Sequence, residues 1–222
     1  MARILKISLV IVAVVILAGV GYGAKGYLDA LGDSDDLRAR ADALIAEGRS
    51  GRDLGAERLR SLLQVEDPAF YEHAGVDFSS DGAGATTISQ SLSKRLAFEQ
   101  FRPGLGKLRQ TGYALGLEQR LTKQQILALW LDTLEMGRGP EGWMTGFYAA
   151  SQAVYGKPPA KLSEDAFLRL VAVLIAPSSF DLLREDPELD VRVERIKRLV
   201  AGQCAPTGHG DVWLDGCRRT PG

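Results

Sequence analysis

The most apolar stretch of the chain lies at its N-terminus. Residues 7–24 read ISLVIVAVVILAGVGYGA, a run interrupted only by one serine, one tyrosine and three glycines. A helix of this length is at the short end of what crosses a hydrocarbon core of about 30 Å. The pattern therefore predicts one membrane-spanning helix within residues 1–25.

The charges that flank this segment predict its orientation. Arg3 and Lys6 precede the apolar run, and only Lys25 follows it closely, so the positive-inside rule leaves the N-terminus in the cytoplasm and exports the rest. A cleaved signal peptide is the alternative, but its apolar region would be about 7–15 residues long and would end in a small-x-small site. Because Tyr22 and Lys25 make a poor cleavage site, we favour an uncleaved anchor.

After the anchor, apolar positions recur at helical spacing and show almost no alternation with period two. Ser34 or Asp35 would begin the first of these helices, and Thr86 or Thr87 would cap the one that follows a glycine-rich loop at residues 78–84. We find no internal repeat and expect a mainly α domain. The predicted helices cover about residues 37–47, 54–65, 87–98, 104–136 (two helices joined near 121–122), 145–155, 163–175 and 189–201.

Composition narrows the classes of protein that fit. The chain has 222 residues, of which 45% are hydrophobic, so it can bury a sizeable core and is not wholly disordered. Its 27 basic and 28 acidic residues show no basic excess, which argues against a nucleic-acid partner. The first 25 residues carry three basic residues and no acidic one, so the body of the protein is mildly acidic.

Two cysteines stand close together near the C-terminus. In an exported protein, such a pair indicates a disulfide, here between Cys204 and Cys217, which would contribute about 3 kcal/mol at most. His209 lies between them, so a Cys-His-Cys metal site is the alternative. No fourth ligand stands at a suitable spacing, and we therefore expect no metal there, a disulfide that fixes the tail, and a solvated His209.

Two neighbouring segments carry candidate chemistry. Residues 65–78 (VEDPAFYEHAGVDF) interleave acidic and aromatic residues, and a carboxyl group held among aromatic rings acquires a raised pKa suited to acid or base catalysis. Residues 84–96 (GATTISQSLSKRL) place Thr87, Gln90 and Lys94 on one helix face behind a helix N-terminus, which suits phosphate. Taken separately, each segment also fits an ordinary solvated surface.

Together, the two segments resemble the family 51 glycosyltransferases, which polymerise peptidoglycan. The order and spacing of the family's motifs hold over about residues 57–180. The first motif, E-D-x-x-F-x-x-H-x-G-x-D, is matched in full by Glu66, Asp67, Phe70, His73, Gly75 and Asp77. The second, G-G-S-T-I-T-Q-Q-L-x-K-N, is matched in part by Gly84, Thr87, Ile88, Gln90, Leu92 and Lys94.

The resemblance implies a lysozyme-like α-helical fold in two lobes, standing on the outer face of a bacterial cytoplasmic membrane. It implies lipid II as substrate and Glu66 as the general base, which activates the 4-hydroxyl of the acceptor sugar for inverting attack with release of undecaprenyl pyrophosphate. Asp67 and His73 would hold Glu66 in place. The implied substrate-binding residues are Asp67, Phe70, His73, Thr87, Gln90, Lys94 and Lys107.

The chain departs from the family on the donor side. In the third motif, Lys107 is retained, but Gly106 replaces an arginine and Gln110 replaces the second catalytic glutamate. Arg109 is a candidate replacement for that arginine. A glutamine carries no proton or charge at neutral pH, and losing one such group typically costs about 2.7–4 kcal/mol in transition-state stabilisation.

These departures leave three hypotheses open. We favour a monofunctional peptidoglycan glycosyltransferase, active or weakened at Gln110, ahead of an inactive scaffold of the same fold that binds lipid II or glycan. The third hypothesis is a lysozyme-like hydrolase with Glu66 as acid, although Gln110 removes its second carboxylate. We expect no transpeptidase, because Ser91–Lys94 spells S-x-x-K inside the second motif and no K-T-G accompanies it.

The resemblance also sets expectations for cofactors, partners and organisation. It implies no required cofactor and leaves open a divalent cation, Mg²⁺ or Mn²⁺, at the pyrophosphate. The implied partners are lipid II, the growing glycan chain and membrane lipid, with other cell-wall synthesis proteins left open. The expected organisation is an anchor at 1–25, a membrane-proximal helical linker at 26–53, a glycosyltransferase-like domain at 54–183, and a C-terminal helix with a disulfide-closed tail at 184–222.

Overall fold

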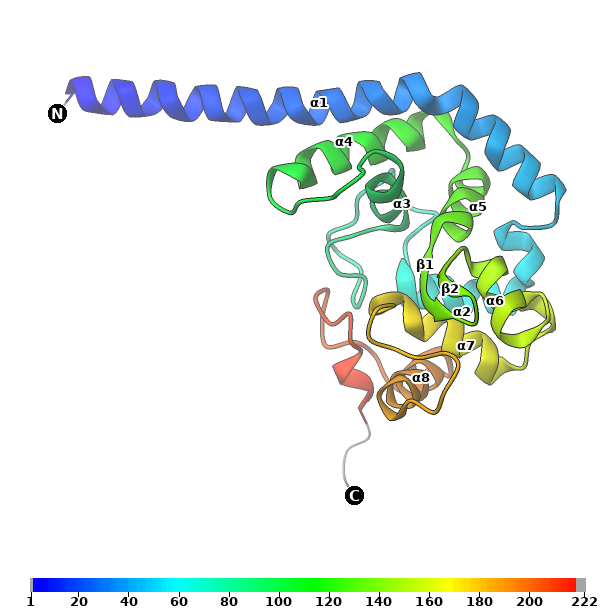
Figure 1. Ribbon diagram of the computed structural model, residues 1–222. Helices are drawn as coiled ribbons and strands as arrows, with labels where there is room; N and C mark the ends of the chain where they lie inside the picture. Colours follow the sequence, from blue (N-terminus) through cyan, green and yellow to red (C-terminus); the bar gives the residue numbers. More distant parts are fainter. Residues whose placement is uncertain (1, 219–222) are drawn as a thin grey trace.

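The computed structural model describes residues 2–218 of the protein, and Figure 1 shows that these residues are mainly helical, as the sequence predicts. The α-helices are α1 (Ala2–Ala46), α2 (Ala56–Glu66), α3 (Ile88–Leu96), α4 (Leu105–Arg120), α5 (Lys123–Thr133), α6 (Phe147–Tyr155), α7 (Glu164–Ala172) and α8 (Pro187–Val200). Short 3₁₀ helices are η1 (Gly51–Leu54), η2 (Pro159–Lys161), η3 (Val173–Ile175) and η4 (Asp215–Cys217).

Helix α1 is continuous over 45 residues, which corrects the prediction of a new helix at Ser34 or Asp35. The polar residues there do not cap a helix, because each has a partner that helical geometry allows. Ser34 Oγ donates to Leu31 O at 2.8 Å, and Asp35 pairs with Arg38 at 2.7 Å. The sequence signal for a helix start is therefore overridden inside a longer helix.

The N-terminal half of α1 has no protein neighbours over most of its length and extends beyond the body of the molecule in Figure 1. Its exposed side chains are mostly valine, leucine and isoleucine. Among the described residues, this helix alone is long and apolar enough to cross a membrane.

The C-terminal half of α1 packs closely along α4 (Figure 1). A Cβ atom at Gly112 would lie 1.9 Å from Gly23 O, so the two backbones approach each other as only glycine allows. The ion pair between Arg109 and Asp29, at 2.9 Å, fastens the same two helices. The packing fixes α4, whose other side reaches the candidate site, relative to the apolar part of α1.

The core lies where α3, α4 and α5 meet α2, α6, α7 and α8. Its largest fully buried side chains are Phe70, Tyr113, Trp130, Phe147 and Phe167. Three helix starts have polar caps, because the Thr87, Thr122 and Ser163 side chains each accept a backbone N–H of the first turn. Of the two caps that the sequence allowed for α3, Thr86 and Thr87, the structure has Thr87.

A short hairpin was missed by the sequence analysis. Strand β1 (Glu135–Gly139) pairs antiparallel with β2 (Gly142–Thr145), in a register that sets Glu135 opposite Thr145. The two strands are too short to show a period-two pattern of apolar residues, and glycines occupy several of their positions. One of them, Gly137, has φ +81° and approaches Pro177 O so closely that a Cβ atom would lie 2.4 Å from it. The strand residues therefore carry no apolar alternation.

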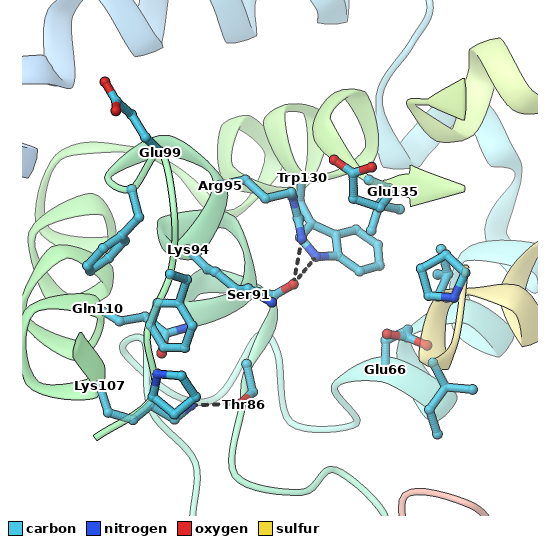
Figure 2. A pocket seen from close by; sticks show the side chains of 17 residues that line it. Glu66, Thr86, Ser91, Lys94, Arg95, Glu99, Lys107, Gln110, Trp130 and Glu135 are labelled. Atoms are coloured by element: carbon cyan, nitrogen blue, oxygen red, sulfur yellow. Dashed lines mark hydrogen bonds between the residues drawn. The ribbon is translucent and has the colours of Figure 1, made fainter. Parts of the chain in front are cut away.

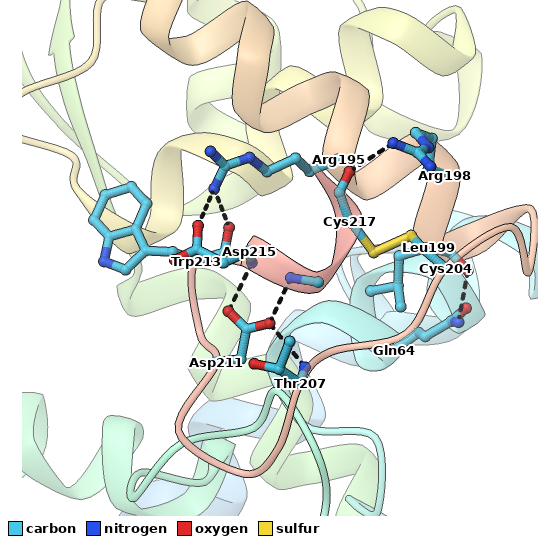
Figure 3. The surroundings of a disulfide bond; sticks show 11 residues. Gln64, Arg195, Arg198, Leu199, Cys204, Thr207, Asp211, Trp213, Asp215 and Cys217 are labelled. Atoms are coloured by element: carbon cyan, nitrogen blue, oxygen red, sulfur yellow. Dashed lines mark hydrogen bonds and ion pairs between the residues drawn. A yellow bond between two sulfur atoms is a disulfide. The ribbon is translucent and has the colours of Figure 1, made fainter. Parts of the chain in front are cut away.

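Cys204 and Cys217 are joined by a disulfide with an S–S distance of 2.02 Å (Figure 3). The loop between them folds back toward the loop that precedes α3. His209 lies at this contact, where its Nδ1 is 2.8 Å from Ser80 O. This hydrogen bond corrects the expectation that His209 is a solvated residue.

Candidate active site

A cavity of about 760 Å³ separates α3 and α4 from the α5–β1 junction and η3. Four of the residues singled out in the sequence line it, namely Glu66, Lys94, Lys107 and Gln110. Figure 2 shows Glu66 on one side of the cavity and the other three on the opposite side. The fold therefore brings a carboxyl group and two cations to one space from three separate helices.

Glu66 is the last residue of α2, and its side chain is partly buried. Burial raises the pKa of Glu66 to about 7, while the positive charges of Arg192 and Arg95 lower it and the charge of Asp67 raises it further. A carboxyl group with this pKa can accept a proton and release it near neutral pH. Glu66 therefore has the properties of a general base or acid.

Asp67 and His73 form a hydrogen-bond network next to Glu66. The Asp67 side chain is 1% exposed and accepts hydrogen bonds from Ile88 N–H at 2.9 Å and from His73 Nε2 at 2.9 Å. Because Gly75 N–H donates to His73 Nδ1 at 3.0 Å, the ring proton lies on Nε2. This network joins the end of α2 to the start of α3, and neither side chain lines the cavity.

Thr87 and Gln90 form the capping box of α3. Thr87 Oγ1 donates to Gly75 O at 2.7 Å, and Gln90 Nε2 donates to Thr111 Oγ1 at 3.0 Å. Both side chains are buried, and neither lines the larger cavity. Thr87 lines the smaller cavity described below, whereas Gln90 lines neither cavity, and both residues position the start of α3.

Phe70 also lies away from the cavity. Its side chain is fully buried, and Lys123 Nζ sits 4.5 Å from the centre of its ring. The resemblance implied that Phe70 binds substrate, whereas the structure places its side chain in the core. Its contact with Lys123 is a cation–π interaction.

The two cations lie close enough to affect each other. Burial lowers the pKa of Lys107, and the positive charge of Lys94 lowers it further. Lys107 Nζ donates to Thr86 Oγ1 at 2.8 Å and to Ala85 O at 3.1 Å, while Lys94 Nζ lies 5.5 Å from the centre of the Phe101 ring. Glu99 also lines this cavity, but neither lysine forms an ion pair with a carboxylate among the described residues, so both ammonium groups can bind an anion.

Gln110 faces this cationic part of the cavity from α4. Its side chain is 1% exposed, and Nε2 donates to Gln90 O at 2.7 Å. The other amide atom, Oε1, is buried and has no hydrogen-bond partner among the described residues. The amide thus provides one acceptor inside the site and carries no charge.

Several further residues line the cavity besides the site candidates that the sequence predicted. Arg95, which stands where the second motif has asparagine, donates to Ser91 Oγ at 2.9 Å, and Trp130 Nε1 donates to the same oxygen at 3.3 Å (Figure 2). Burial lowers the pKa of Arg95 to about 10, against the charges of Glu135 and Glu66, which raise it. The replacement of the motif's asparagine by Arg95 could have indicated a role at the site. The hairpin that carries Glu135 has no sequence pattern that would have indicated one.

Arg109 does not replace the missing arginine. Its guanidinium pairs with Asp29 of α1 at 2.9 Å and lies 5.0 Å from the centre of the Phe98 ring. It is absent from the residues that line the cavity. The side chain fastens α4 to α1 instead.

A second cavity of about 390 Å³ adjoins the first and shares Glu66, Ser91 and Trp130 with it. Its other walls come from the loop at residues 82–87, from Arg192 of α8 and from Val212 of the tail. No lysine lines it. Glu66 therefore lies between a larger cavity with two lysines and a smaller one without them.

Comparisons with known proteins agree on one family. The sequence model of the family described as Transglycosylase matches residues 50–201. Over 160 residues, the chain is 31% identical to the "Biosynthetic peptidoglycan transglycosylase" of Thiobacillus denitrificans, a match that covers 66% of this chain and 67% of that protein. Over 143 residues, it is 29% identical to the protein of the same name in Nitrosomonas eutropha, covering 59% of this chain and 57% of that protein.

A larger protein also matches. The chain is 31% identical over 140 residues to "Penicillin-binding protein 1A" of Escherichia coli, a match that covers 57% of this chain and 16% of that protein. The chain thus spans between about a sixth and two thirds of these relatives.

Proposed function

The chain belongs to the transglycosylase family, the family 51 glycosyltransferases, and on that premise we propose that it polymerises lipid II into glycan strands of peptidoglycan. Membership also confirms the lysozyme-like, mainly α fold expected from the sequence. The observation that carries the proposal is the position of Glu66, with a pKa of about 7, between the two cavities.

Glu66 supplies the base for the glycosyl transfer. In its ionised form, it takes the proton of the 4-hydroxyl of an acceptor sugar in the smaller cavity, and the resulting oxygen attacks the anomeric carbon of a donor in the larger cavity. The bond from that carbon to the pyrophosphate breaks, with inversion. Proximity of the two bound sugars and a base near its pKa are the main contributions of the protein.

The larger cavity suits the donor end of the substrate. Lys94 and Lys107 both line it, and they can stabilise the negative charge that develops on a leaving pyrophosphate. Gln110 occupies the place of the family's second glutamate and contributes only a neutral amide. We therefore propose a working but slow enzyme.

The position of α4 beside α1 supports a substrate with a lipid tail. A Cβ atom at Gly19, within the apolar part of α1, would lie 3.3 Å from Leu108 of α4. Leu105, one turn earlier, is 72% exposed, and Phe98 and Phe101 of the preceding loop line the larger cavity. The donor cavity thus lies next to the apolar helix, where a membrane-bound lipid chain would be.

We propose that α1 holds the protein in the bacterial cytoplasmic membrane, with the N-terminus in the cytoplasm and the catalytic domain outside. Arg3 and Lys6 before the apolar segment support this orientation. The implied partners are lipid II, the growing glycan and membrane lipid.

We propose that the transfer requires no cofactor, and a divalent cation, Mg²⁺ or Mn²⁺, at the pyrophosphate stays a prediction. Gln110 would be a weak ligand for such an ion, because it stands where the family has a carboxylate. The two lysines supply positive charge at that position.

The test is polymerisation of purified lipid II by the full chain in detergent, read on a gel that resolves glycan strands. We expect polymer from the native protein and none from Glu66→Gln, because an amide cannot accept the proton. Glu72→Gln, a change at an exposed carboxylate six residues away, is the matched control and should remain active.

The same assay decides the alternative of a scaffold without turnover, which the uncharged Gln110 favours. Binding of lipid II by a native chain that makes no polymer would overturn the enzyme proposal. Polymer from Gln110→Glu alone would show that this one side chain has abolished the activity.

A further inference from the structure

The end of the chain forms a closed loop that reaches the smaller cavity. The disulfide closes this loop, and α8 contacts it because Arg195 Nη1 donates to Trp213 O at 2.8 Å (Figure 3). We call residues 204–217 the tail loop. It lies beyond the residues 50–201 that match the family, so family membership assigns it no role.

Three hydrogen bonds join the tail loop to the loop that precedes α3. Gly82 N–H donates to Gly208 O at 3.0 Å, and Gly84 N–H donates to His209 O at 2.8 Å. His209 Nδ1 lies 2.8 Å from Ser80 O, and because a carbonyl only accepts, this nitrogen carries the proton and donates. The two loops are thus fastened at successive points.

The two loops also fit together sterically. A Cβ atom at Gly84 would lie 2.5 Å from Val212 Cγ1, and one at Gly82 would lie 2.7 Å from Pro206 Cγ. Both glycines have positive φ, 65° and 77° respectively, and both are buried. Only glycine satisfies both conditions, so the contact is close and specific.

The tail loop has internal order of its own. The Asp211 carboxylate accepts backbone N–H groups of Thr207 at 3.0 Å, Asp215 at 2.7 Å and Gly216 at 2.9 Å (Figure 3). Burial raises the pKa of Asp211, but these donors outweigh it and hold the pKa below its ordinary value. Together with the disulfide, this turn presents Val212 in one fixed position.

Val212 and the loop at residues 82–87 line the smaller cavity, which Glu66 also lines. We propose that the tail loop is a positioning element, which holds the loop before α3 as a fixed wall so that the acceptor sugar lies against Glu66. The proposal rests on the proposed function for the identity of the bound sugar. It adds a segment outside the family domain to the acceptor site.

The first test measures hydrogen exchange at Gly82 and Gly84 in the full-length protein. The chain has two cysteines, so opening the disulfide changes one bond, either with dithiothreitol or in a Cys204→Ala, Cys217→Ala variant. We expect both glycine amides to lose protection while those of α5 keep theirs. Unchanged protection at the two glycines would overturn the proposal.

The second test separates positioning from general stability. When the disulfide is open, the tail loop no longer holds the loop before α3, and the acceptor must order that loop when it binds. KM of this protein for lipid II should therefore rise about tenfold or more, while kcat changes less. Val191→Ala on the exposed face of α8 is the matched control and should leave both constants unchanged. A lower melting temperature with unchanged KM would mean that the tail loop only stabilises the fold, and would overturn the proposal.

The outcomes distinguish this proposal from the proposed function. A native, oxidised protein that makes no polymer would contradict the function, and exchange at the two glycines would then decide alone whether the tail loop holds the wall. Polymer made at equal KM with the disulfide open would leave the function standing and remove the role of the tail loop.

Discussion

At the residue scale, the site depends on a carboxyl group kept in an unfavourable environment. Glu66 lies at the end of α2, and its burial raises its pKa from 4.5 to about 7, despite two nearby arginines. A raised pKa of this kind is typical of catalytic carboxyl groups. It has consequences for both activity and stability.

The first prediction concerns the pH dependence of polymerisation. A general base must be ionised, so kcat/KM should rise with pH up to about 7, the pKa of Glu66, and then level off. The measurement is initial rate at low lipid II concentration from pH 5 to 8.5. A rate already constant between pH 5 and 7 would contradict the assignment of Glu66 as the base.

The second prediction concerns stability. Because the folded-state pKa of Glu66, about 7, exceeds its ordinary value of 4.5, the protein loses stability as pH rises from about 4.5 through 7. Glu66→Gln does not titrate, so it should be more stable than the native chain by about 3 kcal/mol above pH 7 and by little at pH 4. Denaturant unfolding at both pH values measures this, and an equal difference at both would contradict it.

The third prediction distinguishes support from substrate contact. Asp67→Asn leaves one oxygen to accept and replaces the other with an NH2 group, which faces one of the two donors, the Ile88 N–H or the His73 Nε2–H. The variant should therefore lose about 1–3 kcal/mol of the free energy of unfolding. KM of the folded variant should stay near the native value, because Asp67 does not line the cavity. A large rise in KM without loss of stability would show direct contact with substrate.

At the element scale, α4 links the apolar helix to the cationic part of the cavity. One side of α4 contacts α1 through glycines, and residues on its other side, Lys107 and Gln110, line the larger cavity. The sequence predicted α4 but not its partner. Glycines inside a helical pattern only weaken the expectation of a helix, and their use in close packing becomes clear once the neighbouring backbone is known.

The fourth prediction tests this packing. Gly112→Ala would place a Cβ atom 1.9 Å from Gly23 O, so the helices must separate, and the protein should lose about 1–3 kcal/mol of stability. Gly32→Ala in α1, where a Cβ atom meets nothing within 4 Å, is the control and should add up to about 1 kcal/mol. Unfolding in detergent, followed by circular dichroism, compares them. Equal effects would contradict the close contact.

At the scale of the whole molecule, α1 serves two purposes at once. Its N-terminal half is apolar and has no protein neighbours over most of its length, whereas the rest of the helix packs on α4 and α5. The sequence analysis placed a boundary near residue 25, which lies within one continuous helix. Because the helix is continuous, its C-terminal half fixes the orientation of the cavities relative to its apolar N-terminal half.

The fifth prediction separates these two purposes. A chain that starts at Lys25 keeps the Asp29–Arg109 ion pair, so its remaining residues should fold in water with the same helices as in the full chain. It should lose most of its co-sedimentation with phospholipid vesicles, because the apolar segment of residues 7–24 is gone. Vesicle binding equal to that of the full chain would contradict the role of this segment as the anchor.

The sequence by itself determined much of the protein. Apolar periodicity and polar caps identified most helices, because caps such as Thr87 act locally, and the ordered motif around Glu66 identified the family. Those signals depend on residues near one another in the chain. They need no knowledge of the fold.

Only the tertiary structure decided which motif residues reach the cavities. Glu66, Lys94, Lys107 and Gln110 line the larger cavity and Thr87 lines the smaller one, whereas Phe70 and Gln90 are buried and line neither. It also brought Glu135 and the tail loop to the site from distant parts of the chain. The physical reason is that burial and pKa depend on every element packed around a side chain. The order of neighbouring residues along the chain does not reveal which elements those are.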